Sequence, residues 1–149
     1  MHRRSIATIG LLALLLASPA AAIAGDAPPK AAGKAATKPR VVFQVNEDDS
    51  RKWHTVLANL NNVQEELGGR AEISVVVIGP GLGMLKLDAL TANGVQDAMT
   101  AGVRFVACGN SMQSMKLTKD DMIEGIDYAR AGYVEIMRLQ KLGHAYIRP

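Results

Sequence analysis

The sequence contains few of the side chains from which enzymes build active sites. It has one cysteine and three histidines in 149 residues. A single cysteine cannot form a disulfide bond within the chain. His54 and His144 are the histidines outside the N-terminal leader, and two are too few for a catalytic constellation. We expect His54 to face solvent on a helix, and His144 to lie at the surface or at a subunit interface.

The sequence also lacks a hydrophobic run long enough to cross a membrane. The run at residues 6–16 has 11 residues, whereas a spanning helix needs about 20. This run follows Arg3 and Arg4 and precedes Ala22-Ile23-Ala24, which is the pattern of a cleavable export signal. We therefore predict a signal peptide over residues 1–24 and a periplasmic mature protein without stable membrane insertion. A retained anchor is the alternative, and the short run argues against it.

Positive charge is scarce in the part of the sequence that is expected to fold. Residues 25–40 are rich in Ala, Pro, Lys and Gly without apolar periodicity, and we predict a flexible linker there. After residue 40 there are 11 basic and 13 acidic residues, a formal charge of −2. The sequence isoelectric point of about 9.2 therefore comes from the leader and the linker. This charge balance argues against nucleic acid as a partner of the domain.

Residues 41–149 alternate between strand and helix patterns, as expected for one domain. Short apolar runs predict strands at 41–45, 73–78, 103–107, 126–129 and 145–147. Apolar residues at helical spacing predict a first helix that is capped by Asp49 or Ser50 and ended by Gly68-Gly69. They also predict a second helix that Gly102 ends. The fold class that follows is α/β: a three-layer, mostly parallel, doubly wound sheet of about five strands with helices on both faces.

The last third of the domain carries two further helix signals. Thr118 and Asp121 form a predicted capping box for a short helix that continues through Ile123. A final helix, ended by Gly143, is indicated by apolar side chains at helical spacing, namely Val134, Met137, Leu139 and Leu142. We expect these four side chains to form the apolar face of that helix.

Cys108 lies where open α/β sheets bind ligands, directly after a predicted strand. The backbone amides that follow it are predicted to begin a helix whose positive end stabilises a thiolate. The ends of the neighbouring strands bring Asn46 and the Gly79–Gly83 loop to the same edge. We therefore predict Cys108 as the catalytic residue, with a ligand pocket composed of Asn46, Gly79, Pro80, Gly81, Gly109, Asn110 and Ser111.

Two other interpretations of Cys108 stay open from the residues alone. Free cysteine is among the most buried residue types, so Cys108 can be a packing residue in a non-catalytic module that binds a small ligand. Alternatively, Cys108 can bind copper as a soft ligand together with Met112, Met115 and His144. The Gly79–Gly83 loop lacks the spacing of a nucleotide-binding loop and is a weak cofactor signal.

Three segments carry a resemblance to a known family. Residues 79–82 (Gly-Pro-Gly-Leu), residues 102–110 around Cys-Gly-Asn, and the ending Ala-Tyr-Ile-Arg-Pro at 145–149 together resemble the DsrE/DsrF-like family. The resemblance covers residues 41–149. It implies a small α/β fold that assembles into homotrimers or homohexamers.

The same resemblance implies a chemistry for Cys108. In the sulfur-relay members, a cysteine at the end of a central strand carries sulfur as a persulfide, and Cys108 matches that position. Such transfer needs no metal and no organic cofactor. This chain departs from the relay members, which are chiefly cytoplasmic, in its export signal. It also lacks a second cysteine, so the sulfur acceptor must be another molecule or subunit.

Overall fold

The structure, a computed structural model, describes residues 38–149. The predicted signal peptide, and the predicted linker as far as residue 37, lie outside the described residues. Arg40, the last residue of the predicted linker, belongs to the fold because it pairs with Glu72 in the sheet. The domain therefore begins one residue earlier than predicted.

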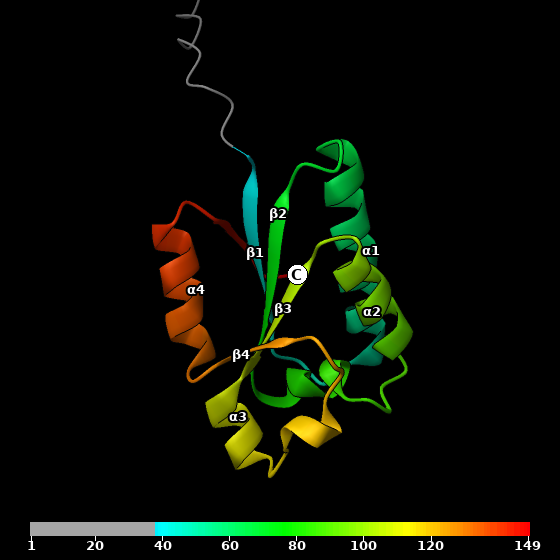
Figure 1. The fold of residues 1–149 in the computed structure, drawn as a ribbon, viewed down its shortest axis with the longest axis vertical. Coiled ribbons are helices and arrows are strands. Elements are labelled where there is room, and N and C mark those ends of the chain that lie inside the picture. The colour runs from blue at the N-terminus through cyan, green and yellow to red at the C-terminus, as the bar shows by residue number, and fades with distance from the viewer. Residues whose placement is uncertain (1–37) are drawn as a thin grey trace, which may run out of the picture. The chain divides into compact units, whose positions relative to one another are not determined.

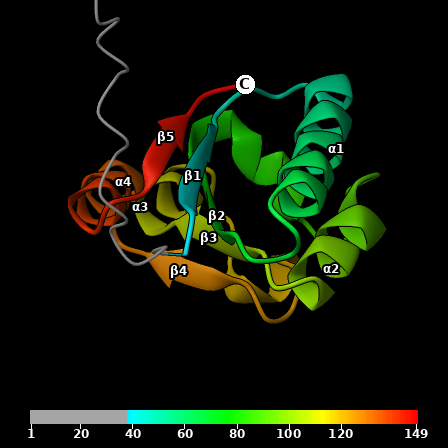
Figure 2. The same cartoon turned by 90° about the horizontal axis from the view of Figure 1, so that it is seen from above.

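Five parallel strands form one sheet, which confirms the predicted fold class (Figures 1 and 2). The order across the sheet is β4-β3-β2-β1-β5. The strands are β1 (Arg40–Val45), β2 (Glu72–Val77), β3 (Arg104–Cys108), β4 (Asp127–Ala129) and β5 (Ala145–Ile147). The three central strands β1, β2 and β3 are almost continuously apolar, because helices cover both faces of a parallel sheet.

The helices divide unequally between the two faces of the sheet. The helices α1 (Ser50–Glu66) and α2 (Ala92–Thr100) lie on one side, and α4 (Gly132–Lys141) lies on the other (Figure 2). The larger core lies under α1 and α2 and includes Phe43 and Phe105. The smaller core lies under α4 and joins Ile136 and Leu139 to Val42, Val76, Val106 and Cys108. One helix therefore covers the face of the sheet on which the sulfur lies.

The start and end of α1 follow the sequence signals. The side chain of Asp49 accepts hydrogen bonds from the amides of Arg51 and Lys52, which satisfies two of the unpaired donors at the helix start. Gly68 and Gly69 follow the helix with φ angles of 62° and 69°, a left-handed conformation that glycine adopts without strain. Both observations confirm the predicted boundaries.

Two connections differ from the prediction. Gly79–Leu85 forms a 3₁₀ helix, η1, instead of a loop, because Leu82, Met84 and Leu85 bury their side chains in the larger core. The capping box at Thr118 is present, and the Thr118 amide donates to Asp121 at 2.7 Å. The helix it caps is only the 3₁₀ segment η2 (Lys119–Asp121), which ends two residues before the predicted Ile123.

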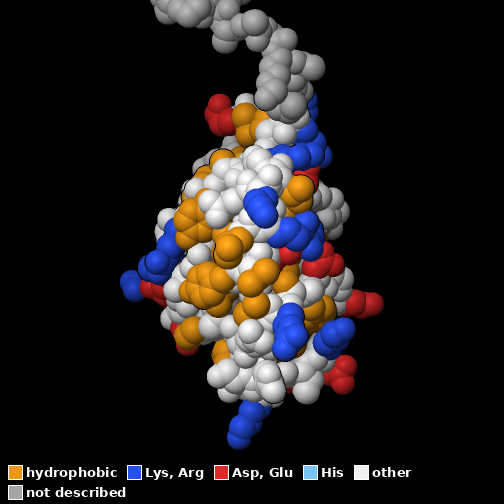
Figure 3. Space-filling view, turned by 90° about the vertical axis from the view of Figure 1, so that its left-hand side faces the viewer, with side chains coloured by type: hydrophobic (Ala, Val, Ile, Leu, Met, Phe, Trp, Pro, Cys, Tyr) orange, Lys and Arg blue, Asp and Glu red, His pale blue; other side chains and the backbone are white. Residues whose placement is uncertain are grey.

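The apolar face predicted for the last helix is only partly correct. The α4 side chains that face the sheet are Ile136 and Leu139, whereas Val134 and Met137 are 62% and 64% exposed. The sheet contacts α4 along one narrow stripe, so the remaining apolar side chains point outward (Figure 3). Within residues 38–149, none of the helices combines the length and the hydrophobicity that crossing a membrane requires.

Candidate active site at Cys108

Cys108 is the last residue of β3 and the residue before α3 (Gly109–Ser114). Its strand lies between β2 and β4, and Cys108 pairs with Ala129 of β4. The thiol therefore lies at the carboxyl edge of the sheet, as predicted. Its exposed fraction is 4%, so the sulfur lies beneath the surface.

Hydrogen-bond donors converge on the sulfur from two helices. The backbone amide of Gly132, the first residue of α4, donates to Sγ of Cys108 at 3.2 Å. The hydroxyl and the amide of Ser111 in α3 are near enough to the sulfur to lower its pKa. The Asn110 amide donates to the carbonyl oxygen of Arg130 at 3.0 Å and also helps to lower the pKa of the thiol. Such donors favour the charged thiolate over the neutral thiol.

These contacts decide the direction in which the thiol pKa moves. Burial raises the pKa of Cys108 because it removes water from the charged form, but the donors from Ser111, Gly132 and Asn110 outweigh that effect. The pKa of Cys108 is therefore held below its ordinary value. A cysteine that only fills space among apolar side chains has the opposite shift. These contacts favour the thiolate form of Cys108.

Ser111 is itself held in the orientation that this contact requires. Its Oγ accepts a hydrogen bond from the amide of Gly79 at 2.8 Å. The hydroxyl proton is then directed away from Gly79 and is available to the sulfur. Gly79, which begins η1 shortly after β2, thus orients the Ser111 hydroxyl toward Cys108 at the end of β3.

Glycine at position 132 allows α4 to approach the sulfur. A Cβ atom added there would lie 2.7 Å from Cγ1 of Ile78 and 3.2 Å from Cβ of Cys108. Carbon atoms in contact need about 3.5 to 4 Å. Any larger residue would therefore move the start of α4 away from Cys108 and lengthen the contact between the amide and the sulfur.

Four of the predicted pocket residues line one cavity beside Cys108. This cavity has a volume of about 380 Å3, and its walls are formed by Gly79, Pro80, Asn110, Ser111, Ser114 and Met115. Asn110 and Ser111 belong to the helix that directly follows Cys108, so the cavity lies near the end of β3, and Cys108 itself does not line it. Its lining carries no charged side chain. We refer to it below as the uncharged cavity.

The other three predicted pocket residues do not line this cavity. Gly81 is buried in η1, where an added Cβ would lie 2.9 Å from the carbonyl oxygen of Val45 and 3.0 Å from Cα of Asn46. Gly109 packs against the backbone of Ala129 and Arg130. These positions serve close backbone packing, so the predicted pocket was too wide.

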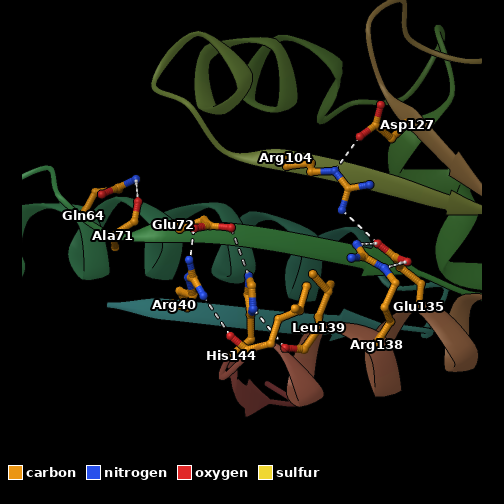
Figure 4. Close-up of polar contacts among 11 residues, drawn as sticks. Arg40, Gln64, Ala71, Glu72, Arg104, Asp127, Glu135, Arg138, Leu139 and His144 are labelled. Carbon is orange, nitrogen blue, oxygen red and sulfur yellow. Dashed lines mark hydrogen bonds and ion pairs between the residues drawn. The ribbon is translucent and has the colours of Figure 1, made fainter. Parts of the chain in front are cut away.

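The proposed copper ligands are not brought together. His144 precedes β5 and lies beside Glu72 (Figure 4). Glu72 begins β2, whereas Cys108 ends the neighbouring parallel strand β3, so the two side chains lie at opposite ends of the strands. Met112 is buried in the larger core, whereas Met115 is 41% exposed. Within the described part of the chain, no group of three or more His, Cys, Asp or Glu side chains lies close enough to hold a metal ion. The copper interpretation that includes His144 is therefore wrong.

His144 is buried within the fold, which corrects the expectation that it lies at the surface or an interface. Its Nδ1 donates to the carbonyl oxygen of Leu139 at 3.0 Å, near the end of α4. Its Nε2 has no hydrogen-bond partner among the described residues and lies 3.5 Å from Oε1 of Glu72. His54 is exposed on α1, as predicted.

Two residues of this site were missed by the sequence analysis. Gly132 is the first residue of α4. The only sequence signal for its role is that glycine, a poor helix former, stands at this position. Arg130 directly follows β4, and its carbonyl oxygen accepts a hydrogen bond from the Asn110 amide at 3.0 Å. The rule that identified Cys108, a polar residue just after a parallel strand, also applies to Arg130.

Comparisons with known proteins place this architecture in a family. The sequence model of the DsrE/DsrF-like family matches residues 40–149. The chain is also similar to the structure of a protein of unknown function, MTH1491, from Methanobacterium thermoautotrophicum. The two are 35% identical, with a TM-score of 0.72, and the match covers 74% of this chain and 99% of that one.

Two more distant structures share the fold. A conserved protein of unknown function, BT1422 from Bacteroides thetaiotaomicron, is 13% identical with a TM-score of 0.62, over 74% of this chain and 94% of that one. The ychN protein from E. coli is 11% identical with a TM-score of 0.63, over 74% of this chain and 99% of that one. No curated protein sequence gives a significant match.

Proposed function

This chain belongs to the DsrE/DsrF-like family, and we propose that it is a sulfur carrier in which Cys108 accepts and passes on sulfane sulfur as a persulfide. The family is associated with sulfur relay in general. The observation that carries the proposal is the hydrogen bond from the Gly132 amide to Sγ of Cys108 at 3.2 Å, and the Ser111 hydroxyl and amide nearby also lower the pKa of the thiol. They support the thiolate, which is the nucleophilic form of cysteine.

The chemistry proceeds in two displacement steps. In loading, the Cys108 thiolate attacks the sulfane sulfur of the donor and forms a new S–S bond. The bond between that sulfur and the rest of the donor breaks, and its electron pair leaves with the donor remnant. In unloading, an acceptor thiolate attacks the outer sulfur, and the electron pair returns to Sγ of Cys108. The same hydrogen-bond donors stabilise the thiolate that this step restores.

Intact mass measurement tests this proposal. Purified protein incubated with thiosulfate or polysulfide should gain the mass of one or more sulfur atoms. Reduction should remove the added mass, and Cys108→Ser should not acquire it. Ser114→Ala is a matched control, because Ser114 lines the uncharged cavity and makes no hydrogen bond to the sulfur. Wild-type protein that stays unmodified under both conditions would contradict the proposal.

The low exposure of the thiol favours a second candidate, a non-catalytic module that binds a small ligand. Cys108 is 4% exposed, which is the burial expected of a packing residue. The two candidates differ in the rate of alkylation by iodoacetamide at neutral pH. A sulfur carrier should react faster than a small-molecule thiol of ordinary pKa. A packing cysteine should react slowly, and Cys108→Ala should keep the ligand site.

We propose that the protein works in the periplasm after export. The proposal is supported by Arg3 and Arg4, the apolar run that follows and the Ala-Ile-Ala site before Gly25. Mass analysis of the full chain produced in a Gram-negative bacterium should find protein that begins at Gly25 in the periplasmic fraction. Recovery of the uncleaved chain from the membrane or the cytoplasm would contradict it.

We also propose that copies of the chain associate as a homotrimer or homohexamer. Support comes from five partly exposed apolar side chains, here called the α4–β5 face: Tyr133, Val134, Met137, Tyr146 and Ile147. Figure 3 views the molecule from the side of α4. Light scattering should give a multiple of the monomer mass, and Met137→Glu should lower it. Leu90→Glu is the control, because Leu90 is 83% exposed but precedes α2.

A further inference from the structure

Cys108 shares one face of β3 with an arginine that the mechanism described above does not use. Side chains alternate between the two faces of a strand, so Arg104 and Cys108, which begin and end β3, point to the same face. Val106 lies between them on that face and packs with Cys108 in the smaller core under α4. The α4 side of the sheet therefore carries a guanidinium at the start of β3 and the sulfur at its end.

The first turn of α4 contacts both ends of this row. The amide of Gly132 donates to Sγ of Cys108 at 3.2 Å. Three residues later, Oε1 of Glu135 accepts a hydrogen bond from Nη1 of Arg104 at 2.9 Å (Figure 4). Residues three apart are neighbours on one face of a helix. One turn of α4 is therefore attached to β3 by two polar contacts, one at each end of the strand.

Few other contacts fix the start of α4 on the sheet. The apolar side chains that α4 buries in the smaller core are Ile136 and Leu139, which lie further along the helix. Ala131, the residue before the helix, has no side chain that can accept a hydrogen bond from the helix start. The sulfur of Cys108 accepts the bond that a capping side chain would otherwise accept. The distance from the helix start to the sulfur therefore depends on how the first turn is held.

The ion pair that holds this turn is sheltered and permanently charged. The side chain of Glu135 is 10% exposed and that of Arg104 is 39% exposed, so salt screens the pair less than a fully exposed one. Arg104 is also fixed by an ion pair with Asp127 of β4. Hydrogen bonds from Arg138 and Arg104 lower the pKa of Glu135 to about 2. The carboxylate therefore stays ionised over the whole pH range in which a thiol titrates.

We propose that the ion pair between Arg104 and Glu135 positions the start of α4 so that its first amide stabilises the Cys108 thiolate. That amide belongs to Gly132, through which both residues act, so Arg104 and Glu135 are positioning residues. The inference rests on the proposed function, because a sulfur carrier needs a reactive thiolate. It adds the contact, remote from the sulfur in the chain, that maintains this form.

The pH profile of Cys108 alkylation by iodoacetamide separates positioning from a direct effect of charge. The midpoint of the profile reports the pKa of the thiol, and the plateau at high pH reports access to it. A nearby cation stabilises a thiolate, and a nearby anion destabilises it. A direct charge effect would therefore raise the midpoint in Arg104→Gln and lower it in Glu135→Gln. Positioning predicts that both variants raise the midpoint, because either change breaks the same ion pair.

The size and the additivity of the shifts are also predicted. Each single variant should lower the thiolate fraction at neutral pH by roughly three- to tenfold, which is part of the roughly 10- to 150-fold loss expected if a charged hydrogen bond disappears completely. The double variant should fall no further than the single ones. Glu135→Asp keeps the charge but shortens the side chain, so it should also raise the midpoint. It replaces Glu135→Gln if urea denaturation shows that the latter does not fold.

Two arginines serve as matched controls. Arg138→Gln removes a guanidinium from the same carboxylate, but Arg138 and Glu135 lie on one helix, so their pair does not attach α4 to the sheet. Arg40→Gln removes an arginine that begins β1, pairs with Glu72 and is not on a strand next to β3. Neither control should move the midpoint. A wild-type midpoint in Arg104→Gln, or a lowered midpoint in Glu135→Gln, would overturn the positioning role.

Sulfur loading separates this inference from the proposed function. Wild type, Arg104→Gln and Glu135→Gln are incubated with thiosulfate at neutral pH, and the gain in intact mass is followed over time. If wild type gains no sulfur although both variants raise the alkylation midpoint, the carrier is overturned and the positioning role stands. If wild type gains sulfur and both variants keep the wild-type midpoint, the carrier stands and the positioning role is overturned.

Discussion

The amide of Gly132 donates a hydrogen bond to Sγ of Cys108 across 3.2 Å, and it joins two residues that lie 24 positions apart. Gly132 begins α4, a helix of ten residues, so the positive end of its dipole points at the sulfur. From the sequence, stabilisation of the thiolate is predicted for the amides that directly follow Cys108. Those amides contribute, but the longer helix approaches from a different part of the chain.

Gly132→Ala should weaken this contact and destabilise the fold. The added Cβ would lie 2.7 Å from Ile78, and relief of such overpacking costs about 1 to 3 kcal/mol of unfolding free energy. The Cys108 pKa should rise, so the alkylation rate plotted against pH should shift to higher pH. Gly94→Ala, where the added Cβ would lie 2.8 Å from Leu57 on the far face, controls for overpacking alone and should not shift this profile.

Ser111→Ala should raise the Cys108 pKa because it removes the hydroxyl that donates to the sulfur. A hydrogen bond to a charged group contributes about 1.5 to 3 kcal/mol, so the thiolate fraction at neutral pH should fall by roughly 10- to 150-fold. The readout is again the alkylation rate as a function of pH. Ser114→Ala should leave the profile at its wild-type position. Equal profiles for Ser111→Ala and wild type would show that the hydroxyl does not stabilise the thiolate.

Glu135→Gln should reduce stability at neutral pH and much less in acid. Hydrogen bonds from Arg138 and Arg104 lower the pKa of Glu135 to about 2, although burial acts in the opposite direction. A carboxyl whose folded pKa is depressed stabilises the fold above its unfolded pKa, and that stabilisation is lost as pH falls toward the folded value. We expect a deficit of roughly 2 to 3 kcal/mol near pH 7 that shrinks between about pH 5 and pH 2.

Urea denaturation of wild type and Glu135→Gln across that pH range measures the deficit. Glu124→Gln is the control, because Glu124 is exposed and makes no ion pair with a described residue. A deficit that does not depend on pH would mean that packing, and not charge, accounts for the effect of Glu135.

His144→Ala should destabilise the domain without affecting the thiol. The imidazole is 5% exposed and its Nδ1 donates to the carbonyl oxygen of Leu139. Its removal leaves a cavity, which costs about 2 to 4 kcal/mol. The Leu139 carbonyl stays paired, because the amides of Leu142 and His144 also donate to it. The alkylation rate of Cys108 in the folded protein should stay at the wild-type value. His54→Ala, at an exposed position, should change stability by less than about 0.5 kcal/mol.

Local signals predicted most of the fold. The apolar runs located all five strands, Asp49 and the two glycines after residue 67 set the limits of α1, and the alternation of elements gave a parallel sheet. These features depend on periodicity and on residues close together in the chain. Where the prediction was wrong, as for the outward-facing Val134 and Met137, the side chain's environment depends on which part of the helix the sheet contacts.

The candidate site was also predicted only in part from the sequence. By itself the sequence determined that the chain has one sulfur nucleophile and that it ends a buried parallel strand, because strand position depends on neighbouring residues. Only the tertiary structure decided which groups surround that sulfur. Gly132 comes from the start of α4 and Arg130 from the connection between β4 and α4. His144, expected at the surface, is buried at the opposite end of the strands from the thiol. Hydrogen bonds and burial depend on distances between segments remote in the chain, which packing sets and composition does not encode.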